Sequence, residues 1–167
     1  MPRRVKRYDA IPPGTVVSLK GLISRPDRNG DRGEVEDYDS SSGRYTVLLE
    51  EGEYLRVKAA NLLQHVHVGL QGLESRPDLN NQKGTILAWD DHKHRYNIYI
   101  SGKVVSLKPS NVILEEGTVA QIVGLQSKPQ LNGQWGTIQG WIRETNRYDV
   151  QLSASQVVRI KTDNVRV

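Results

Sequence analysis

The sequence predicts an all-β protein made of three tandem five-stranded barrels. The first observation is a triplication: one thirteen-residue segment appears as GLISRPDRNGDRG, GLESRPDLNNQKG and GLQSKPQLNGQWG, beginning at residues 21, 72 and 124. The second is the alternation of apolar and polar residues around these segments, which is typical of half-buried strands. The third is that no segment keeps a helical period of about 3.6 residues over three turns, so no amphipathic helix is expected.

The same order of elements is predicted in every repeat. A first strand (GTVVSLKGL, HVHVGLQGL, GTVAQIVGL) leads into the triplicated segment, the repeat loop, and GEV, GTI and GTI begin the second strand. The third strand, RYTVLL in the first copy, places Tyr45, Val47 and Leu49 on one face. A fourth strand and a short turn precede the last strand, at KAANLL, KPSNVI and KTDNVR. Pro and Asn supply turn chemistry in the loop, and its last Gly is expected to let the chain tighten.

Two of these patterns resemble known families. The ending KPSNVI at 108–113 resembles the turn before the last strand of SH3 domains. The loop followed by Gly, any residue and an apolar residue, at 21–35, 72–86 and 124–138, is similar to KOW and Tudor-type barrels. From residue 14 onward the chain therefore resembles an array of SH3-like barrels, a fold that hosts many unrelated roles. It lacks the acidic, Tyr-rich loop and neighbouring Trp with which SH3 domains grip proline-rich peptides, so that recognition mode is not expected.

The repeat boundaries divide the chain into four parts. These are a basic N-terminal arm at 1–13 and SH3-like repeats at 14–63, 64–114 and 115–167. The links are short, with Gln64 and His65 at the first joint and Glu115 and Glu116 at the second. Since a domain of about 50 residues buries little core and is marginally stable alone, we expect each repeat to pack against its neighbour.

Composition narrows the functional classes. The 167 residues include no Cys, which excludes disulfides, thiolate nucleophiles and Cys-based metal sites and fits an intracellular protein, cytoplasmic or nuclear. No apolar run approaches the roughly 20 residues that span a bilayer, and the basic start MPRRVKRYDA lacks the apolar stretch of a secretory signal. Most of the net charge of +4 lies in the arm, so the repeats are close to neutral. A soluble monomer is expected.

Residues that would support metal binding or catalysis are sparse. Two His-x-His pairs, His65/His67 and His92/His94, have the spacing of two ligands on one face of a strand. Neither pair recurs in the other repeats or has a third ligand, so no metal and no cofactor is expected. A hydrolase needs a nucleophile, a positioned base and an orienting group, and the serines at 40–42 have no His at an equivalent place. The chain is therefore not expected to be an enzyme.

An aromatic residue and an Arg recur in one hairpin of every repeat. They are Tyr38, Trp89 and Trp141, seventeen residues after the first Gly of the loop, and Arg44, Arg95 and Arg147, which open the next strand. On regular strands both face away from the barrel interior, where a cation–π pair contributes about 0.5–1 kcal/mol. Such a pair either clamps the hairpin or offers a platform for peptides or unstacked bases, and a β-bulge would turn the aromatic inward. Trp135, which does not recur, is either a binding hot spot or a cover for the last core.

Three functional hypotheses follow. The first, which we prefer, is a non-catalytic scaffold whose repeats bind a protein or peptide partner through weak contacts strengthened by avidity, with the aromatic and Arg residues above as contacts. The second is nucleic-acid binding, RNA rather than DNA, through the arm residues Arg3, Arg4, Lys6 and Arg7 and stacking on the aromatic rings. The near-neutral repeats argue against it. The third is a structural spacer in a larger assembly.

Overall fold

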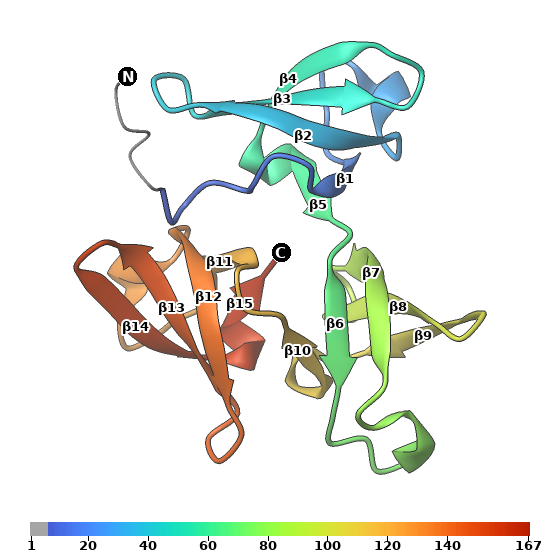
Figure 1. The fold of residues 1–167 in the computed structure, drawn as a ribbon, viewed down its shortest axis with the longest axis vertical. Helices are drawn as coiled ribbons and strands as arrows, with labels where there is room; N and C mark the ends of the chain where they lie inside the picture. Colours follow the sequence, from blue (N-terminus) through green and yellow to red (C-terminus); the bar gives the residue numbers. More distant parts are fainter. Residues whose placement is uncertain (1–6) are drawn as a thin grey trace. The chain divides into compact units, whose positions relative to one another are not determined.

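A computed structural model describes residues 7–167. Over that range the chain forms three five-stranded antiparallel sheets, one for each repeat, and no α-helix (Figure 1). This confirms the all-β fold with five strands in each repeat. Within the same range, no helix is long and apolar enough to cross a membrane.

The three sheets share one strand order, with the fourth and fifth strands at the two ends. The first sheet contains β1 (Val16–Leu19), β2 (Arg32–Asp39), β3 (Arg44–Leu49), β4 (Tyr54–Lys58) and β5 (Leu62–Gln64), in the order β4-β3-β2-β1-β5. The second contains β6 (His67–Leu70), β7 (Lys83–Asp90), β8 (Arg95–Ile100), β9 (Lys103–Leu107) and β10 (Val112–Leu114), in the order β10-β6-β7-β8-β9. The third contains β11 (Val119–Ile122), β12 (Trp135–Ile142), β13 (Arg147–Ser153), β14 (Gln156–Lys161) and β15 (Val165–Arg166), in the order β14-β13-β12-β11-β15.

Each sheet is accompanied by two short 3-10 helices, one in the repeat loop and one before the last strand. They are η1 (Pro26–Arg28), η2 (Ala59–Asn61), η3 (Pro77–Leu79), η4 (Pro109–Asn111), η5 (Pro129–Leu131) and η6 (Thr162–Asn164). Pro opens the helix in all three repeat loops, because its fixed φ suits the first helical position and its missing N–H is not needed there.

In each sheet, buried and more exposed side chains alternate along the third strand, and the buried ones contribute to the core. In β3, Tyr45, Val47 and Leu49 are at most 2% exposed, and the residues between them are less buried. In β8, Tyr96 and Ile98 form the same inward face. Since residues two apart on a strand share a face, the alternating segments specify which side chains enter the core.

The Asn of the repeat loop closes that loop with two hydrogen bonds. Asn29 Oδ1 accepts from the Leu22 N–H at 2.8 Å, and its Nδ2 donates to the Leu22 carbonyl at 3.2 Å. The same two bonds join Asn80 to Leu73 and Asn132 to Leu125 at 2.8–3.1 Å. The amide therefore satisfies both backbone groups of the Leu as a neighbouring strand would. This gives the triplicated loop a structural role in every repeat.

The Gly that ends the repeat loop is needed for close packing rather than for a turn. The φ angles of Gly33, Gly84 and Gly136 lie outside the left-handed region. A Cβ on Gly33 would lie 2.5 Å from the Leu48 carbonyl oxygen, and one on Gly84 or Gly136 would lie 2.6 Å from a side-chain carbon of the third strand. Steric contact with the third strand, and not the expected tightening of the chain, explains the residue.

A β-bulge interrupts the second strand of every repeat. In β2 the register on β3 shifts between Val35 and Asp37, and equivalent shifts occur in β7 and β12. An extra residue reverses the alternation of side chains that follow it. The strand is therefore not regular, and the recurring aromatic faces inward. Its cross-strand partner is the buried Tyr in each case: Tyr38 with Tyr45, Trp89 with Tyr96, and Trp141 with Tyr148.

The chain divides into two compact units that do not coincide with the repeats. One comprises residues 11–68 and 83–107, and the other comprises 69–82 and 108–167 with the segment that ends at Ala10. The second repeat contributes to both units. The first joint between repeats lies in the former unit and the second joint in the latter.

A buried tyrosine holds the second joint. The Tyr148 hydroxyl, in the third repeat, accepts from the Leu114 N–H at 2.8 Å and donates to the Val112 carbonyl at 3.0 Å. Both partners belong to β10, the last strand of the second repeat. At the start of the first repeat, the Tyr45 hydroxyl accepts from the N–H of the buried Ile11 at 2.9 Å. In the first and third repeats, the tyrosine of the third strand thus bonds the segment that precedes its own repeat.

The first joint contains a half-buried histidine. Gln64, expected in the link, is the buried last residue of β5. His65 Nδ1 lies 2.8 Å from the Ile86 carbonyl of the second repeat, and Nε2 contacts the Ser18 hydroxyl of the first. A carbonyl can only accept, so Nδ1 carries the proton and Nε2 of the neutral ring accepts from Ser18. Burial lowers the pKa of His65, and the positive charge of Arg32 lowers it further, against the bond to Ile86.

The stability of the chain is expected to fall as the pH drops below the ordinary histidine pKa of 6.5. A lowered folded-state pKa means that the unfolded chain binds more protons in this window, so acid favours unfolding. His65→Gln should flatten the dependence, and His92→Gln, in an exposed hairpin tip, should leave it unchanged. Urea unfolding of the unchanged chain and of both variants between pH 5 and 8 measures how the free energy of unfolding depends on pH. An unchanged dependence in the His65 variant would contradict this role.

Candidate functional site

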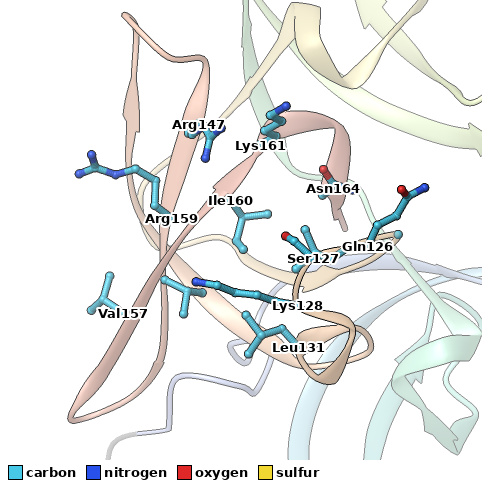
Figure 2. Close-up of a pocket in the computed structure, with 13 residues that line it drawn as sticks. Gln126, Ser127, Lys128, Leu131, Arg147, Val157, Arg159, Ile160, Lys161 and Asn164 are labelled. Atoms are coloured by element: carbon cyan, nitrogen blue, oxygen red, sulfur yellow. The ribbon is translucent and has the colours of Figure 1, made fainter.

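A cavity in the third repeat is the candidate site. It has a volume of about 740 Å³ and lies between the repeat loop and β14 (Figure 2). This volume falls within the range of about 300–1,000 Å³ that is usual for ligand sites. Thirteen residues line it: Gly124, Leu125, Gln126, Ser127, Lys128, Leu131, Arg147, Val157, Val158, Arg159, Ile160, Lys161 and Asn164.

The charges on the cavity wall are all positive. Lys128, Arg147, Arg159 and Lys161 line it, and no acidic residue does. Arg159 bonds Asp149 on the neighbouring strand at 3.1 Å. Across the described residues, the side chains of the other three cations form no ion pair and no hydrogen bond. Together they give the cavity an unneutralised positive charge, which favours an anionic ligand.

The cavity runs along an edge of the sheet. Residues 157–161 of β14 all line it, although successive side chains of a strand point to opposite faces. A cavity that touches five successive residues is expected where it follows the edge of the strand. β14 is the terminal strand of its sheet. On the adjacent strand, Arg147 lies directly across from Lys161, and such like-charge pairs are destabilising when nothing neutralises them.

In the first repeat, the cation equivalent to Lys128 forms ion pairs with carboxylates of the same repeat. Arg25 stands where the third repeat has Lys128, and it bonds Glu53 at 3.2 Å and Asp27 at 3.4 Å. Hydrogen bonding to Asp27, and then to Glu53, raises the pKa of Arg25 above its ordinary value. Arg28, one turn further along the loop, contacts Glu51 and Glu53.

A second ion pair of the first repeat lies at the position of Arg159. Arg56 occupies that position and bonds Asp39 at 3.0 Å. The hydroxyls of Ser41 and then Ser42 lower the pKa of Asp39 to about 2, with a smaller contribution from Arg56. The carboxylate is therefore ionised and available to its Arg at neutral pH.

The third repeat lacks these acids. The positions of Asp27, Asp31, Asp39, Glu51 and Glu53 are held by Gln130, Gln134, Ile142, Ala154 and Gln156. The second repeat resembles the first at the position of Lys128. Arg76 stands there and forms an ion pair with Asp78 at 2.9 Å. The third repeat therefore differs from the first at Lys128, which has no acidic partner among the described residues, whereas the equivalent Arg25 pairs with Asp27 and Glu53.

The predicted aromatic residues do not line this cavity. Tyr38, Trp89 and Trp141 are partly buried and lie against the inward tyrosines described above. The ring centroids are 4.7 Å apart for Tyr38 and Tyr45, and 4.8 Å apart for Trp89 and Tyr96. The Trp141 indole also donates to Asn146 Oδ1 at 2.7 Å, and Trp135 is partly buried on β12.

The predicted Arg residues occupy different surroundings. Arg147 lines the cavity, whereas Arg44 and Arg95 donate to the carbonyls of Arg56 and Ser106 at 3.5 and 3.1 Å. Each Arg lies one residue out of register with the aromatic of its hairpin. A cation–π contact to Trp141 is made instead by Arg143, at 5.1 Å from the ring centroid.

Among the described residues, those predicted for the basic arm and the His-x-His pairs do not line the cavity. Arg3, Arg4 and Lys6 of the arm lie outside the described residues, and Arg7 bonds Asp9 at 3.2 Å. The His67 ring bonds the Thr85 hydroxyl at 3.1 Å, and the His94 ring packs edge-on against Trp89. No group of three potential metal ligands occurs in residues 7–167.

Sequence reasoning missed Lys128, Arg159 and Lys161. For Lys128 the signal was present in the repeats, because aligning them shows Asp27 and Glu53 in the first copy where the third has Gln130 and Gln156. The features that the three copies share do not carry this signal. Comparison with known proteins found no matching family model and no matching curated protein.

Proposed function

We propose that the chain is a non-catalytic binding module, built of SH3-like repeats related to KOW and Tudor-type barrels, that recognises a protein or peptide partner. The observation that carries the proposal is the cavity of the third repeat, which combines four cations with the apolar side chains of Leu131, Val157 and Ile160. Mixed apolar and polar walls are usual for ligand sites. Contacts by the other repeats add avidity, because the short links keep their effective concentration high.

Single-stranded RNA is the second candidate ligand, favoured by the same four cations. Phosphates pair well with Lys and Arg, and such binding weakens steeply as salt rises. The hairpin aromatics are assigned to clamping their hairpins in this proposal, since they pack on buried tyrosines. Stacking of bases would need rings that are free to receive them.

The test is a selection of random peptides displayed on phage, made against the full chain, alongside fluorescence anisotropy with labelled single-stranded RNA. We expect enriched peptides that bind the chain at near-physiological salt, and RNA binding that is lost at that salt. Failure to enrich any peptide, together with RNA binding that survives the salt, would overturn the proposal in favour of RNA. If neither ligand binds, a spacer role becomes the better account.

A further inference from the structure

We propose that the cavity of the third repeat binds an extended acidic peptide segment, whose carboxylates pair with Lys128, Arg147 and Lys161. This deepens the proposed function and rests on it, because it specifies the chemistry of the partner and the repeat that selects it. Figure 2 shows Lys128 reaching from the loop toward β14, with Arg147 and Lys161 on the strand side. The three cations thus come from two walls of one cavity.

The first repeat provides an internal precedent for the ligand. There, Glu53 pairs with Arg25 at the position of Lys128, and Glu51 pairs with Arg28 on the same loop. The chain's own carboxylates therefore fill a place beside the repeat loop that Gln156 and Ala154 leave without charge in the third repeat. An incoming Glu or Asp side chain would restore the same kind of ion pair.

The backbone geometry favours an extended segment. The cavity follows the edge of β14, and a terminal strand can accept a peptide as an added strand through main-chain hydrogen bonds. Side chains of such a peptide alternate in direction. One set would meet the face that Val157, Arg159 and Lys161 share, where Val157 is 48% exposed, and the other would meet the face of Val158 and Ile160.

The wall composition favours a peptide over nucleic acid. None of the thirteen lining residues is aromatic, whereas proteins that hold single strands combine a basic groove with aromatic rings on which bases stack. Occupation by carboxylates would also relieve the opposition of Arg147 and Lys161. A bound acidic peptide should therefore raise the melting temperature of the chain.

The experiment measures fluorescence anisotropy of the full chain with three labelled probes at low and near-physiological salt. The probes are a ten-residue peptide alternating Glu with Ser or Val, the same peptide with Gln for every Glu, and a ten-nucleotide oligouridine. We expect the Glu peptide alone to bind at near-physiological salt. Lys128→Gln with Lys161→Gln should weaken its binding about tenfold, since two exposed ion pairs are removed.

Two further variants sharpen the test. Gln130→Asp with Gln156→Glu restores two acids of the first repeat, and it should also weaken the Glu peptide about tenfold by supplying internal partners. Lys58→Gln with Lys93→Gln removes the same charge elsewhere on the chain and should leave binding within about twofold. Thermal unfolding of each variant checks that the fold is retained.

The outcomes separate this inference from the proposed function. Equal binding of the Glu and Gln peptides, or no effect of the Lys128/Lys161 variant, would overturn the acidic-peptide assignment. If the phage selection enriches peptides without acidic residues, the acidic-peptide assignment is wrong, but the proposed function as a peptide-binding module is retained. Binding of the oligouridine in place of the Glu peptide would contradict the acidic-peptide assignment and point to phosphate as the anion.

Discussion

Replacing Gly136 by Ala is expected to lower the free energy of unfolding by roughly 2–3 kcal/mol, the upper part of the range for overpacked cores. The added Cβ would lie 2.6 Å from Val150 Cγ1, 2.7 Å from the Gln151 carbonyl oxygen and 2.9 Å from Leu152 Cδ2. Gln151 pairs with Thr137 of β12 and with Val157 of β14, so its carbonyl cannot move aside without disturbing the sheet. Urea unfolding followed by circular dichroism at constant pH measures the loss.

Gly140, in the same strand, is the matched control. A Cβ there would meet nothing within 4 Å, and its φ lies outside the left-handed region. Gly140→Ala should be close to neutral or stabilise the chain by about 0.4–1 kcal/mol, because it restricts the unfolded chain. Equal destabilisation by the two substitutions would show that strand glycine as such matters, and not the close approach at Gly136.

Replacing Tyr148 by Phe is expected to cost about 2 kcal/mol, because a lost partner leaves buried backbone groups unsatisfied. The Leu114 N–H and the Val112 carbonyl both bond the hydroxyl, and both residues are at most 4% exposed. Phe fills the same space, so the effect isolates the hydroxyl. Urea unfolding gives the size of the loss, and hydrogen exchange should show faster exchange at the Leu114 amide.

Tyr99→Phe is the control for this substitution. Tyr99 is 49% exposed and lies on a third strand, as Tyr148 does. Its hydroxyl reaches solvent, so its removal should change stability by less than about 0.5 kcal/mol. If the two Phe variants unfold at the same urea concentration, the tyrosine at the second joint does not hold β10 as the structure indicates.

Most of the fold was predictable because the same pattern of strands and turns recurs in three repeats of the sequence. Alternation placed Tyr45, Val47 and Leu49 in the core, and the structure confirms it. The hairpin aromatics were harder to predict, because one extra residue in the second strand reverses the faces of everything after it. Whether a strand bulges depends on its pairing with the next strand, which residue periodicity does not report.

The candidate site was predicted only in part. Arg147 was named, but Lys128 and Lys161 were not, since they lie 33 positions apart in the sequence and meet only through the packing of the repeat loop beside β14. The charge of a site also depends on which acids reach its cations. Arg25 and Arg28 count as basic in composition, yet Asp27, Glu51 and Glu53 neutralise them.

The sequence by itself determined the local structure of this protein: the number of repeats, the strands, the loop closed by Asn, and the side chains that enter the core. These depend on the order of neighbouring residues and on the two-residue period of a strand. The tertiary structure decided the role of each loop glycine, the inward turn of the aromatics, the two joints and the basic cavity. Each of these depends on distances between residues far apart in the chain, because steric contact and charge pairing act only at close range.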